Sequence, residues 1–332
     1  MQSSPNMELD KLTQEIFSQL EQKWLSDCQS PNPWKKTRIL SIDGGGGARP
    51  LVAAHALVRL EDLLRSMSGN PDARIVDFFD VLAGTGVGGI LAVMLAADDG
   101  NGHPMYTARE AVQHLCSRQK EMFRPAGGFF FGRRRRFSCR SLERVLREAL
   151  KAEDGRDLTL RDTCRPLLVP IYDLNSSAPF VFSRADAADV PSFDFELWKV
   201  CRATSATPSL FRPFRLESVD GKTACVAIDG GLVMNNPSAA AVTHVLHNKR
   251  DFPSVHGVED LMVLSLGNGP LGGGRRAPSK RSCDGRCSTP EVVEIVLDGV
   301  SGTVDQMLGN AFCWNRMDYV RIQVSCSFPR GI

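Results

Sequence analysis

The stretch FFDVLAGTGVGGILAVMLAA, residues 78–97, decides the fold that we expect for this chain. It begins as an apolar run typical of a buried strand and resumes as an apolar run typical of a buried helix. Between the two runs lies a corner that contains Gly84, Thr85, Gly86 and Gly88. Strand, sharp turn and helix in this order are typical of a nucleophile elbow, the turn on which many hydrolases carry an attacking serine. Gly86 takes the central position, so the stretch predicts an elbow without its nucleophile. A tight packing turn without chemistry is the alternative.

The same order of elements recurs along the chain. Residues 38–47, RILSIDGGGG, form an apolar run that ends in four glycines, and a helix-like segment follows over residues 51–67. Further strand-like runs occupy residues 166–174, 179–183, 224–230, 261–267 and 319–324. Apolar strands that alternate with helices predict an α/β fold in which a mostly parallel sheet is covered on both faces.

Composition excludes several classes of protein. The 332 residues are 42% hydrophobic and 23% charged, and 40 basic against 38 acidic residues leave a net charge of +2. A charge this close to balance does not favour binding to nucleic acid. We expect no membrane-spanning helix, because no apolar run reaches about 18 residues. The first 20 residues carry acidic side chains and no long apolar core, which argues against a secretory signal.

The cysteines and histidines favour a reduced, cytoplasmic protein without a metal or other cofactor. Several of the ten cysteines lie in apolar runs, where a reduced thiol packs as a small hydrophobe. Cys283 and Cys287 are one residue too far apart for a C-x-x-C pair, and no second pair has zinc-finger spacing. The six histidines all lie outside the glycine-rich motifs.

The first glycine loop runs from Asp43 through Gly44 to Arg49. Consecutive glycines after a strand let backbone N–H groups converge on a phosphate or on a developing oxyanion. A dinucleotide fingerprint would need glycine where Arg49 stands, and a Walker loop would need Gly-Lys-Ser/Thr. A plain tight turn is a third interpretation.

A third motif is AIDGGLVMNNPSAAAV, residues 227–242. Asp229 closes a strand-like run, Gly230 and Gly231 follow, and a new helix is expected to start after Pro237. An aspartate at the end of a strand is well placed to point into a site. By itself the motif is equally consistent with an ordinary Asp-Gly turn.

Taken together, these three motifs resemble those of the patatin-like lipid acyl hydrolases. The resemblance runs in order from about residue 38 to residue 323 and includes ATSATPSLFRPF (203–214) and VLSLGNG (263–269). It implies a three-layer α/β/α sandwich of the patatin type. It also implies a catalytic dyad, in which a serine on the elbow attacks the acyl carbonyl, an aspartate activates it without a histidine, and the glycine loop forms the oxyanion hole.

Carried to this chain, the resemblance makes Asp229 the base and places Gly86 at the position of the nucleophile. It assigns the oxyanion hole to Gly44, Gly45, Gly46 and Gly47. The elbow is shaped by Gly84, Thr85 and Gly88, and supporting roles fall to Arg49, Gly230 and Gly231. Glycine in place of the elbow serine resembles one subgroup of plant patatin-like proteins, often called group III. Proteins of that subgroup are credited with non-specific hydrolysis of phospholipids and galactolipids, or are described as inactive.

Two functions follow from the missing hydroxyl. In a serine triad, loss of the nucleophile costs on the order of 10⁶ in kcat, and roughly 10³–10⁴ over water survives. The first hypothesis is therefore a weak, non-specific hydrolase of membrane glycerolipids, in which Asp229 activates water. The second is a non-catalytic lipid-binding or regulatory protein. Thr85, Ser205 and Ser209 are alternative nucleophiles, and a nucleotide-binding α/β protein is a third hypothesis.

One segment suggests how the chain meets its lipid substrates. Residues 124–140, RPAGGFFFGRRRRFSCR, set three phenylalanines beside four arginines. Aromatic side chains insert at bilayer interfaces, and basic residues favour anionic lipid surfaces. We expect peripheral membrane contact through Phe129, Phe130, Phe131, Arg133, Arg134, Arg135 and Arg136. A solvated arginine run beside buried phenylalanines is the alternative.

The chain divides into three parts by composition. Residues 1–37 are expected to form an extension and linker, with an amphipathic helix over 8–25. Residues 38–325 form the patatin-like domain, with its motifs in 38–245. The tail 326–332 departs from the resemblance, and we expect that the chain is truncated there.

Overall fold

The computed structural model describes residues 36–44, 51–126, 137–208, 210–268, 289–315 and 317–323. Within these residues the strands form an eight-stranded sheet in the order β5-β6-β3-β2-β1-β7-β8, with β4 also paired to β3. The strands are β1 (Thr37–Ile42), β2 (Val81–Gly84), β3 (Leu167–Asp173), β4 (Ala178–Ser183), β5 (Phe214–Glu217), β6 (Ala224–Asp229), β7 (Leu261–Leu266) and β8 (Tyr319–Ile322).

The centre of the sheet is parallel and one flank is antiparallel. Strands β3, β2, β1, β7 and β8 pair in parallel in that order. Strands β4 and β6 pair antiparallel to β3, and β5 pairs antiparallel to β6. The prediction of a mostly parallel central sheet is confirmed. The antiparallel flank brings the end of β6, and with it Asp229, beside the parallel strands.

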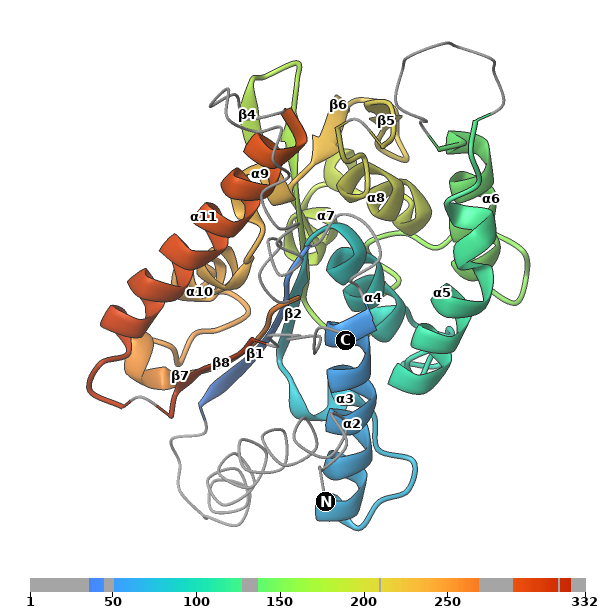
Figure 1. Cartoon of the computed structure of the whole chain (residues 1–332). Helices are drawn as coiled ribbons and strands as arrows, with labels where there is room; N and C mark the ends of the chain where they lie inside the picture. The colour runs from blue at the N-terminus through green and yellow to red at the C-terminus, as the bar shows by residue number, and fades with distance from the viewer. Residues whose placement is uncertain are drawn as a thin grey trace, which may run out of the picture.

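Helices cover both faces of the sheet (Figure 1). They are α2 (Leu51–Ser68), α3 (Ile75–Phe78), α4 (Gly86–Ala96), α5 (Ala108–Met122), α6 (Cys139–Ala149), α7 (Arg184–Asp189), α8 (Leu197–Thr204), α9 (Gly231–Met234), α10 (Ser238–His247) and α11 (Thr289–Ala311), with short 3₁₀ turns at Pro191–Phe193 and Val258–Asp260. Helices α2, α4, α5, α6 and α8 lie on one side, and α10 and α11 on the other.

The sheet has a helix layer on each face because successive side chains of its strands are apolar and point to opposite faces. Leu40 and Leu82 belong to the apolar cluster under α2 and α4, whereas their neighbours Ile39 and Val81 belong to the cluster under α10 and α11. Successive side chains of a strand point to opposite faces, so a run that is apolar at every position needs cover on both sides. The three-layer α/β/α sandwich expected from the sequence is therefore the observed fold.

Two strand predictions needed correction. The strand expected from residue 78 begins only at Val81, because residues before it form the short helix α3. The Arg74 backbone N–H donates to the Asp77 carboxylate at 2.8 Å, which stabilises the start of that helix. Strand β5 was missed, since its four residues carry little apolar character and lie at the edge of the sheet.

Helix α4 starts in close contact with β1 and β2. A Cβ on Gly84 would lie 2.3 Å from the Gly88 carbonyl oxygen, and one on Gly88 would lie 2.5 Å from the Ile42 and Asp43 carbonyl oxygens. Backbone atoms cannot yield to such contacts without moving the helix. These glycines therefore fix where the elbow lies above the sheet.

Some predictions fall outside the described residues, namely the N-terminal helix over 8–25 and the tail 326–332.

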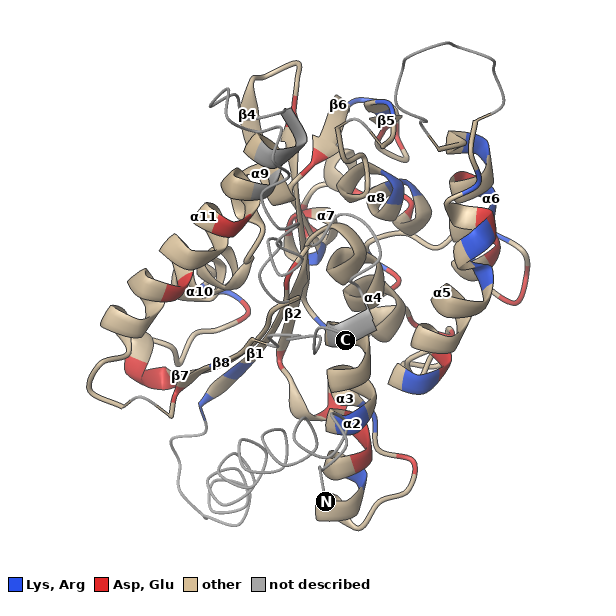
Figure 2. Cartoon of the chain, in the orientation of Figure 1, with Lys and Arg blue, Asp and Glu red and all other residues tan. Residues whose placement is uncertain are grey.

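Among the helices that the structure describes, none is both long and apolar enough to cross a membrane. Figure 2 shows acidic and basic residues interspersed on α5 and α6. Arg118 illustrates this, since it pairs with both Glu121 and Glu148.

We expect Gly88→Ala to lower the free energy of unfolding by about 3 kcal/mol, because the added methyl group meets two carbonyl oxygens. Gly299→Ala is the matched control. It lies exposed on α11 with no atom near its Cβ position, so it should stabilise the chain by about 1 kcal/mol. Urea denaturation measures both values. Equal effects of the two substitutions would contradict the close-contact argument.

Candidate active site

The elbow predicted from residues 78–97 is present. Strand β2 ends at Gly84, Thr85 is extended, and Gly86 opens α4 with φ +56°. A left-handed backbone at this position is what a nucleophile elbow requires and what glycine adopts freely. The Gly86 N–H donates to the Thr204 hydroxyl at 2.9 Å, and that hydroxyl donates to the Pro170 carbonyl at 3.0 Å. Helix α8 and strand β3 thus hold the turn.

Two of the alternative nucleophiles have hydroxyls that serve the fold. Thr85 is fully buried, and its hydroxyl donates to the Met234 carbonyl at 2.7 Å. Ser205 donates to the Cys201 carbonyl at 2.7 Å within its own helical turn. A hydroxyl committed in this way is a poor nucleophile, because attack requires breaking the bond first. Ser209 lies outside the described residues.

Asp229 is buried at the end of β6, with 5% of its surface exposed. One carboxylate oxygen accepts a hydrogen bond from the Gly231 N–H at 2.8 Å, and the other accepts one from the Thr207 hydroxyl at 2.6 Å. Burial raises the pKa of this carboxyl, while the bonds from Thr207 and Gly231 act to lower it. A carboxyl with a raised pKa is a stronger base once it has ionised.

An apolar cavity at the elbow lies between Gly86 and Thr207. It is small, about 20 Å³, and is lined by Gly86, Val87, Ile90, Met122, Phe123, Leu142, Ser205, Thr207, Leu210 and Phe211. Thr207 both lines this cavity and donates to the Asp229 carboxylate. The cavity therefore has a basic group directly behind one wall and the vacant nucleophile position at another.

A second apolar cavity lies next to the first one and shares part of its wall. It measures about 40 Å³ and lies against α2, α4 and α5, lined by Ala54, Val87, Leu91, Val112, Leu115, Cys116, Gln119, Met122 and Phe123. The two cavities share Val87, Met122 and Phe123. Both cavities are lined mainly by apolar side chains, and each has room for no more than a few waters.

The glycine loop begins beside the elbow. A Cβ on Gly44 would lie 3.2 Å from the Thr85 carbonyl oxygen. The Gly44 N–H, however, donates to the Asn235 carbonyl at 3.0 Å. Of the four glycines assigned to the oxyanion hole, Gly44 therefore has an amide that already serves the fold. Gly45, Gly46 and Gly47, together with Arg49, lie outside the described residues.

The glycines after Asp229 have packing roles. A Cβ on Gly230 would lie 2.2 Å from the Pro170 carbonyl oxygen, and one on Gly231 would lie 3.1 Å from the Asp229 carboxylate. Gly230 must be glycine so that the chain can turn back over β3, whereas a side chain at Gly231 would press on the Asp229 carboxylate. The supporting role of both residues in catalysis stays a prediction.

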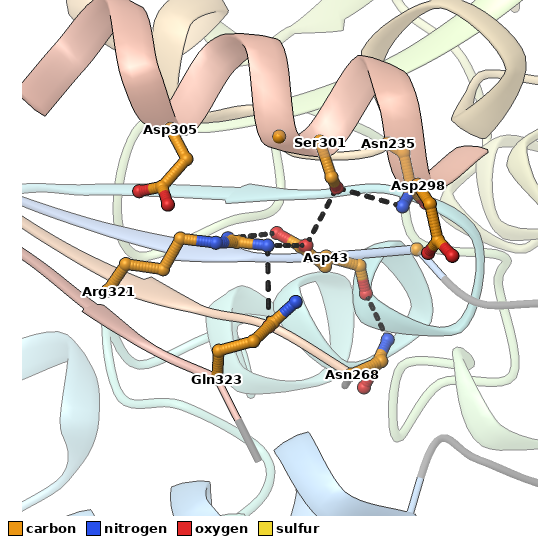
Figure 3. Close-up of a pocket in the computed structure, with 10 residues that line it drawn as sticks. Asp43, Asn235, Asn268, Asp298, Ser301, Asp305, Arg321 and Gln323 are labelled. Carbon is orange, nitrogen blue, oxygen red and sulfur yellow. Dashed lines mark hydrogen bonds and ion pairs between the residues drawn. The ribbon is translucent and has the colours of Figure 1, made fainter. Parts of the chain in front are cut away.

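Sequence reasoning missed a polar network behind the glycine loop (Figure 3). Asp43 is buried and pairs with Arg321 of β8 through both carboxylate oxygens, at 3.0 and 2.5 Å. The Ser301 hydroxyl of α11 donates to Asp43 at 3.1 Å, and the Asn235 side-chain amide donates to Ser301 at 3.0 Å. The sequence contains one indication of this network, namely that Asp43 stands at the end of an apolar strand. The partners of Asp43 could not be identified in this way, because they lie far along the chain.

No cluster for a metal is found in the part of the chain that the structure describes, where no three His, Cys, Asp or Glu side chains gather closely enough. Cys283 and Cys287 lie outside it. A family model described as patatin-like phospholipase matches residues 40–242, which include the elbow, the first glycine loop and the Asp-Gly-Gly motif.

The chain belongs to the patatin-like phospholipase family. It is 63% identical to "Probable inactive patatin-like protein 9" of Arabidopsis thaliana, over 96% of this chain and 82% of that protein. It is 41% identical to "Patatin-like protein 6" of the same plant, over 97% and 72%. The crystal structure of VipD from Legionella pneumophila aligns at 14% identity over 70% of this chain and 50% of its own, with a TM-score of 0.32. The family resemblance inferred from the motifs is confirmed.

The buried Asp229 carboxyl should make stability depend on pH. Because its pKa is raised on folding, the stability linked to it is complete at acid pH, below the ordinary range of an aspartate. That stability is lost as the pH rises through the raised pKa. Asp229→Asn keeps the shape and removes the charge. The melting temperature of Asp229→Asn minus that of the parent chain should therefore increase as the pH rises from about 4 to about 8.

The control is Asp72→Asn, which removes an exposed carboxylate in the turn before α3. Its melting temperature should follow that of the parent at each pH. A constant difference between Asp229→Asn and the parent over this range would show that burial does not raise the pKa of Asp229.

Proposed function

We propose that the chain is a weak, non-specific acyl hydrolase of membrane glycerolipids, both phospholipids and galactolipids. The observation that carries this proposal is that Thr207 joins the Asp229 carboxylate to the cavity at Gly86. Water in the space that a serine side chain would occupy could give a proton to Asp229 and attack the acyl carbonyl. Collapse of the tetrahedral intermediate then expels the alcohol, which takes that proton, and a free fatty acid remains.

The apolar cavities support the acyl part of this proposal. Because the cavities measure only about 20 and 40 Å³, an acyl chain would have to move the side chains of Val87, Met122 and Phe123 apart. Its ester would then lie at the start of α4, which contributes the partial positive charge of a helix N-terminus. That charge favours the negative oxygen of the intermediate. The resemblance assigns the backbone N–H groups of the oxyanion hole to the loop that begins at Gly44.

A second function is favoured by a specific observation. Both oxygens of Asp229 already accept a hydrogen bond, and Gly86 supplies no attacking group. A catalytically inactive patatin-like protein that binds or senses lipids would keep the same cavity. Its lipid binding would need neither a free Asp229 carboxylate nor a nucleophile at position 86. The name of the relative from Arabidopsis thaliana, "Probable inactive patatin-like protein 9", is consistent with this alternative.

Release of fatty acid by the parent chain and by Asp229→Asn separates the two functions. Loss of a general base costs about 10²–10⁴ in rate, so the variant should fall to the background of protein-free vesicles. Mixed vesicles of phosphatidylcholine and galactolipid serve as substrate. Asp72→Asn should retain the parent rate. Equal release by the parent and by Asp229→Asn would support the inactive protein.

Replacement of Gly86 by serine should restore covalent chemistry. The substitution places a side chain at φ +56° and costs about 1–2 kcal/mol of stability. It should nevertheless raise fatty-acid release at least about 100-fold and allow labelling by a fluorophosphonate. Gly86→Ala is the control, since it carries the same backbone strain without the hydroxyl. A folded Gly86→Ser variant that neither labels nor hydrolyses would show that the elbow and Asp229 are not aligned for the dyad.

We also propose a cytoplasmic protein that docks on membranes peripherally through Phe129–Phe131 and Arg133–Arg136, which lie outside the described residues. The ends of that segment support the proposal. Pro125 and Phe137 pair as an antiparallel bridge, and the Phe137 N–H donates to the Leu210 carbonyl at 2.9 Å. Phe137 also packs on Phe123 and Phe211, with ring centroids 5.3 and 5.7 Å away. Both of those rings line the elbow cavity, so the segment leaves the fold beside it.

Replacing Arg133, Arg134, Arg135 and Arg136 by serine should weaken binding to vesicles that contain anionic lipid at least about tenfold. Vesicle co-sedimentation measures this. Serine in place of Arg140, Arg144, Arg147 and Arg156 is the matched control for net charge. Unchanged binding of the first variant would exclude the arginine run as the docking segment.

A further inference from the structure

Helix α11 carries an exposed apolar face on the outside of the molecule (Figure 1). Of the nine large apolar side chains that stand exposed in the described part of the chain, five belong to this helix or to the turn after it. They are Val292, Ile295, Val296, Met307 and Trp314, with 45, 64, 39, 61 and 97% of their surface exposed. Single exposed apolar residues are ordinary, but a row of them along one helix indicates a contact surface.

The spacing of these residues places them on one side of the helix. Val296 and Met307 are eleven residues apart, which is about three helical turns. Leu297, Ser301 and Leu308 are buried on the opposite side. We call the exposed side the outer face of α11.

The outer face is also uncharged. Every exposed side chain that the structure describes from residue 292 to residue 315 is neutral. Basic residues attract a protein segment to anionic lipid, so this composition does not favour a bilayer as the partner. An uncharged apolar face of this length suits the apolar side of another helix.

The N-terminal segment of the chain joins the fold beside this face. The Lys36 ammonium, on the first described residue, pairs with the Asp318 carboxylate at 2.6 Å. The Asp318 N–H donates to the Asn315 carbonyl at 3.0 Å, and Asn315 directly follows Trp314. The residues before Lys36 are therefore tethered next to the C-terminal end of α11.

That segment has a pattern that matches the outer face. Residues 8–25, which lie outside the described residues, are predicted from their sequence to form an amphipathic helix. Its apolar side would consist of Leu9, Leu12, Ile16, Leu20 and Trp24. Such a helix would be about 27 Å long, against about 35 Å for the 23 residues of α11. The linker 26–35 can span about 33 Å, which allows the two helices to lie side by side.

We propose that the segment 8–25 docks as a helix on the outer face of α11, with its apolar side against Val296, Met307 and Trp314. A second copy of the chain is disfavoured as the occupant, because the tethered segment is present at a high effective concentration. Docking would also hold α11 in place. This bears on the candidate site, since the Ser301 hydroxyl of α11 donates to Asp43 at 3.1 Å.

The exposed thiol of Cys313 reports whether the outer face is covered. Cys313 lies next to Trp314, and Cys116 of α5 is an exposed thiol on the other side of the sheet. In the parent chain, iodoacetamide should alkylate Cys313 at least about tenfold more slowly than Cys116, because the docked helix excludes the reagent. Mass spectrometry of tryptic peptides measures the rate at each cysteine. The fully buried Cys201 should stay unmodified, which verifies that the fold is intact.

Substitutions in the segment test whether it is the occupant. Ile16→Asp together with Leu20→Asp removes two apolar contacts, so it should raise the alkylation rate of Cys313 at least about tenfold and leave the control thiol on α5 unchanged. Gln14→Asp together with Ser18→Asp is the matched control. It adds the same charge on the opposite side of the predicted helix, so both rates should remain those of the parent chain.

A substitution on α11 tests the same contact from the other side. Met307→Asp should also raise the alkylation rate of Cys313 at least about tenfold, because a carboxylate cannot be covered by the apolar side of a helix without cost. Val219→Asp places the same charge at a site of similar exposure, 57%, after β5. It should leave the rate unchanged.

Equal alkylation rates of Cys313 and Cys116 in the parent chain would overturn the proposal, as would protection of Cys313 that persists in the variant with Ile16→Asp and Leu20→Asp. Protection that is lost when the protein is diluted would assign the outer face to a second copy of the chain. Protection that arises only when vesicles are added would assign it to a membrane. None of these measurements depends on hydrolysis, so the outcome is separate from that of the acyl hydrolase proposal.

Discussion

The close approach of α4 to the ends of β1 and β2 is the constraint on which the candidate site depends. Backbone carbonyls of Ile42 and Asp43 occupy the space where Gly88 would carry a side chain. Because the helix can lie that close, Gly86 meets Thr204, and Thr85 reaches the carbonyl of Met234. The elbow, Gly44 and the Asp-Gly-Gly segment are thereby brought together from three distant parts of the sequence.

Sequence patterns within single segments predicted the central strands and the elbow, because these depend on the residues of one segment. Apolar strands followed by glycine turns predicted β1, β2 and the elbow, since burial on both faces leaves a continuous apolar run. The short edge strand β5 and the helix α3 were missed, because four residues carry too little periodicity to indicate either structure. Family resemblance, rather than spacing, assigned the role of Asp229.

The network around Asp43 shows why the rest of the site could not be predicted. Arg321 and Ser301 lie in elements whose own patterns look like ordinary strand and helix. Their contact with Asp43 depends on β8 joining β7 and on α11 packing beside it, which is tertiary information.

The ion pair between Asp43 and Arg321 joins residues 278 positions apart. Contacts of such long range form late, because the entropy of closing the intervening chain must be overcome first. During synthesis, Asp43 therefore stays without this partner until β8 has left the ribosome. A nascent chain that lacks β8 would hold an uncompensated aspartate at the end of β1, where the folded protein holds a neutral pair.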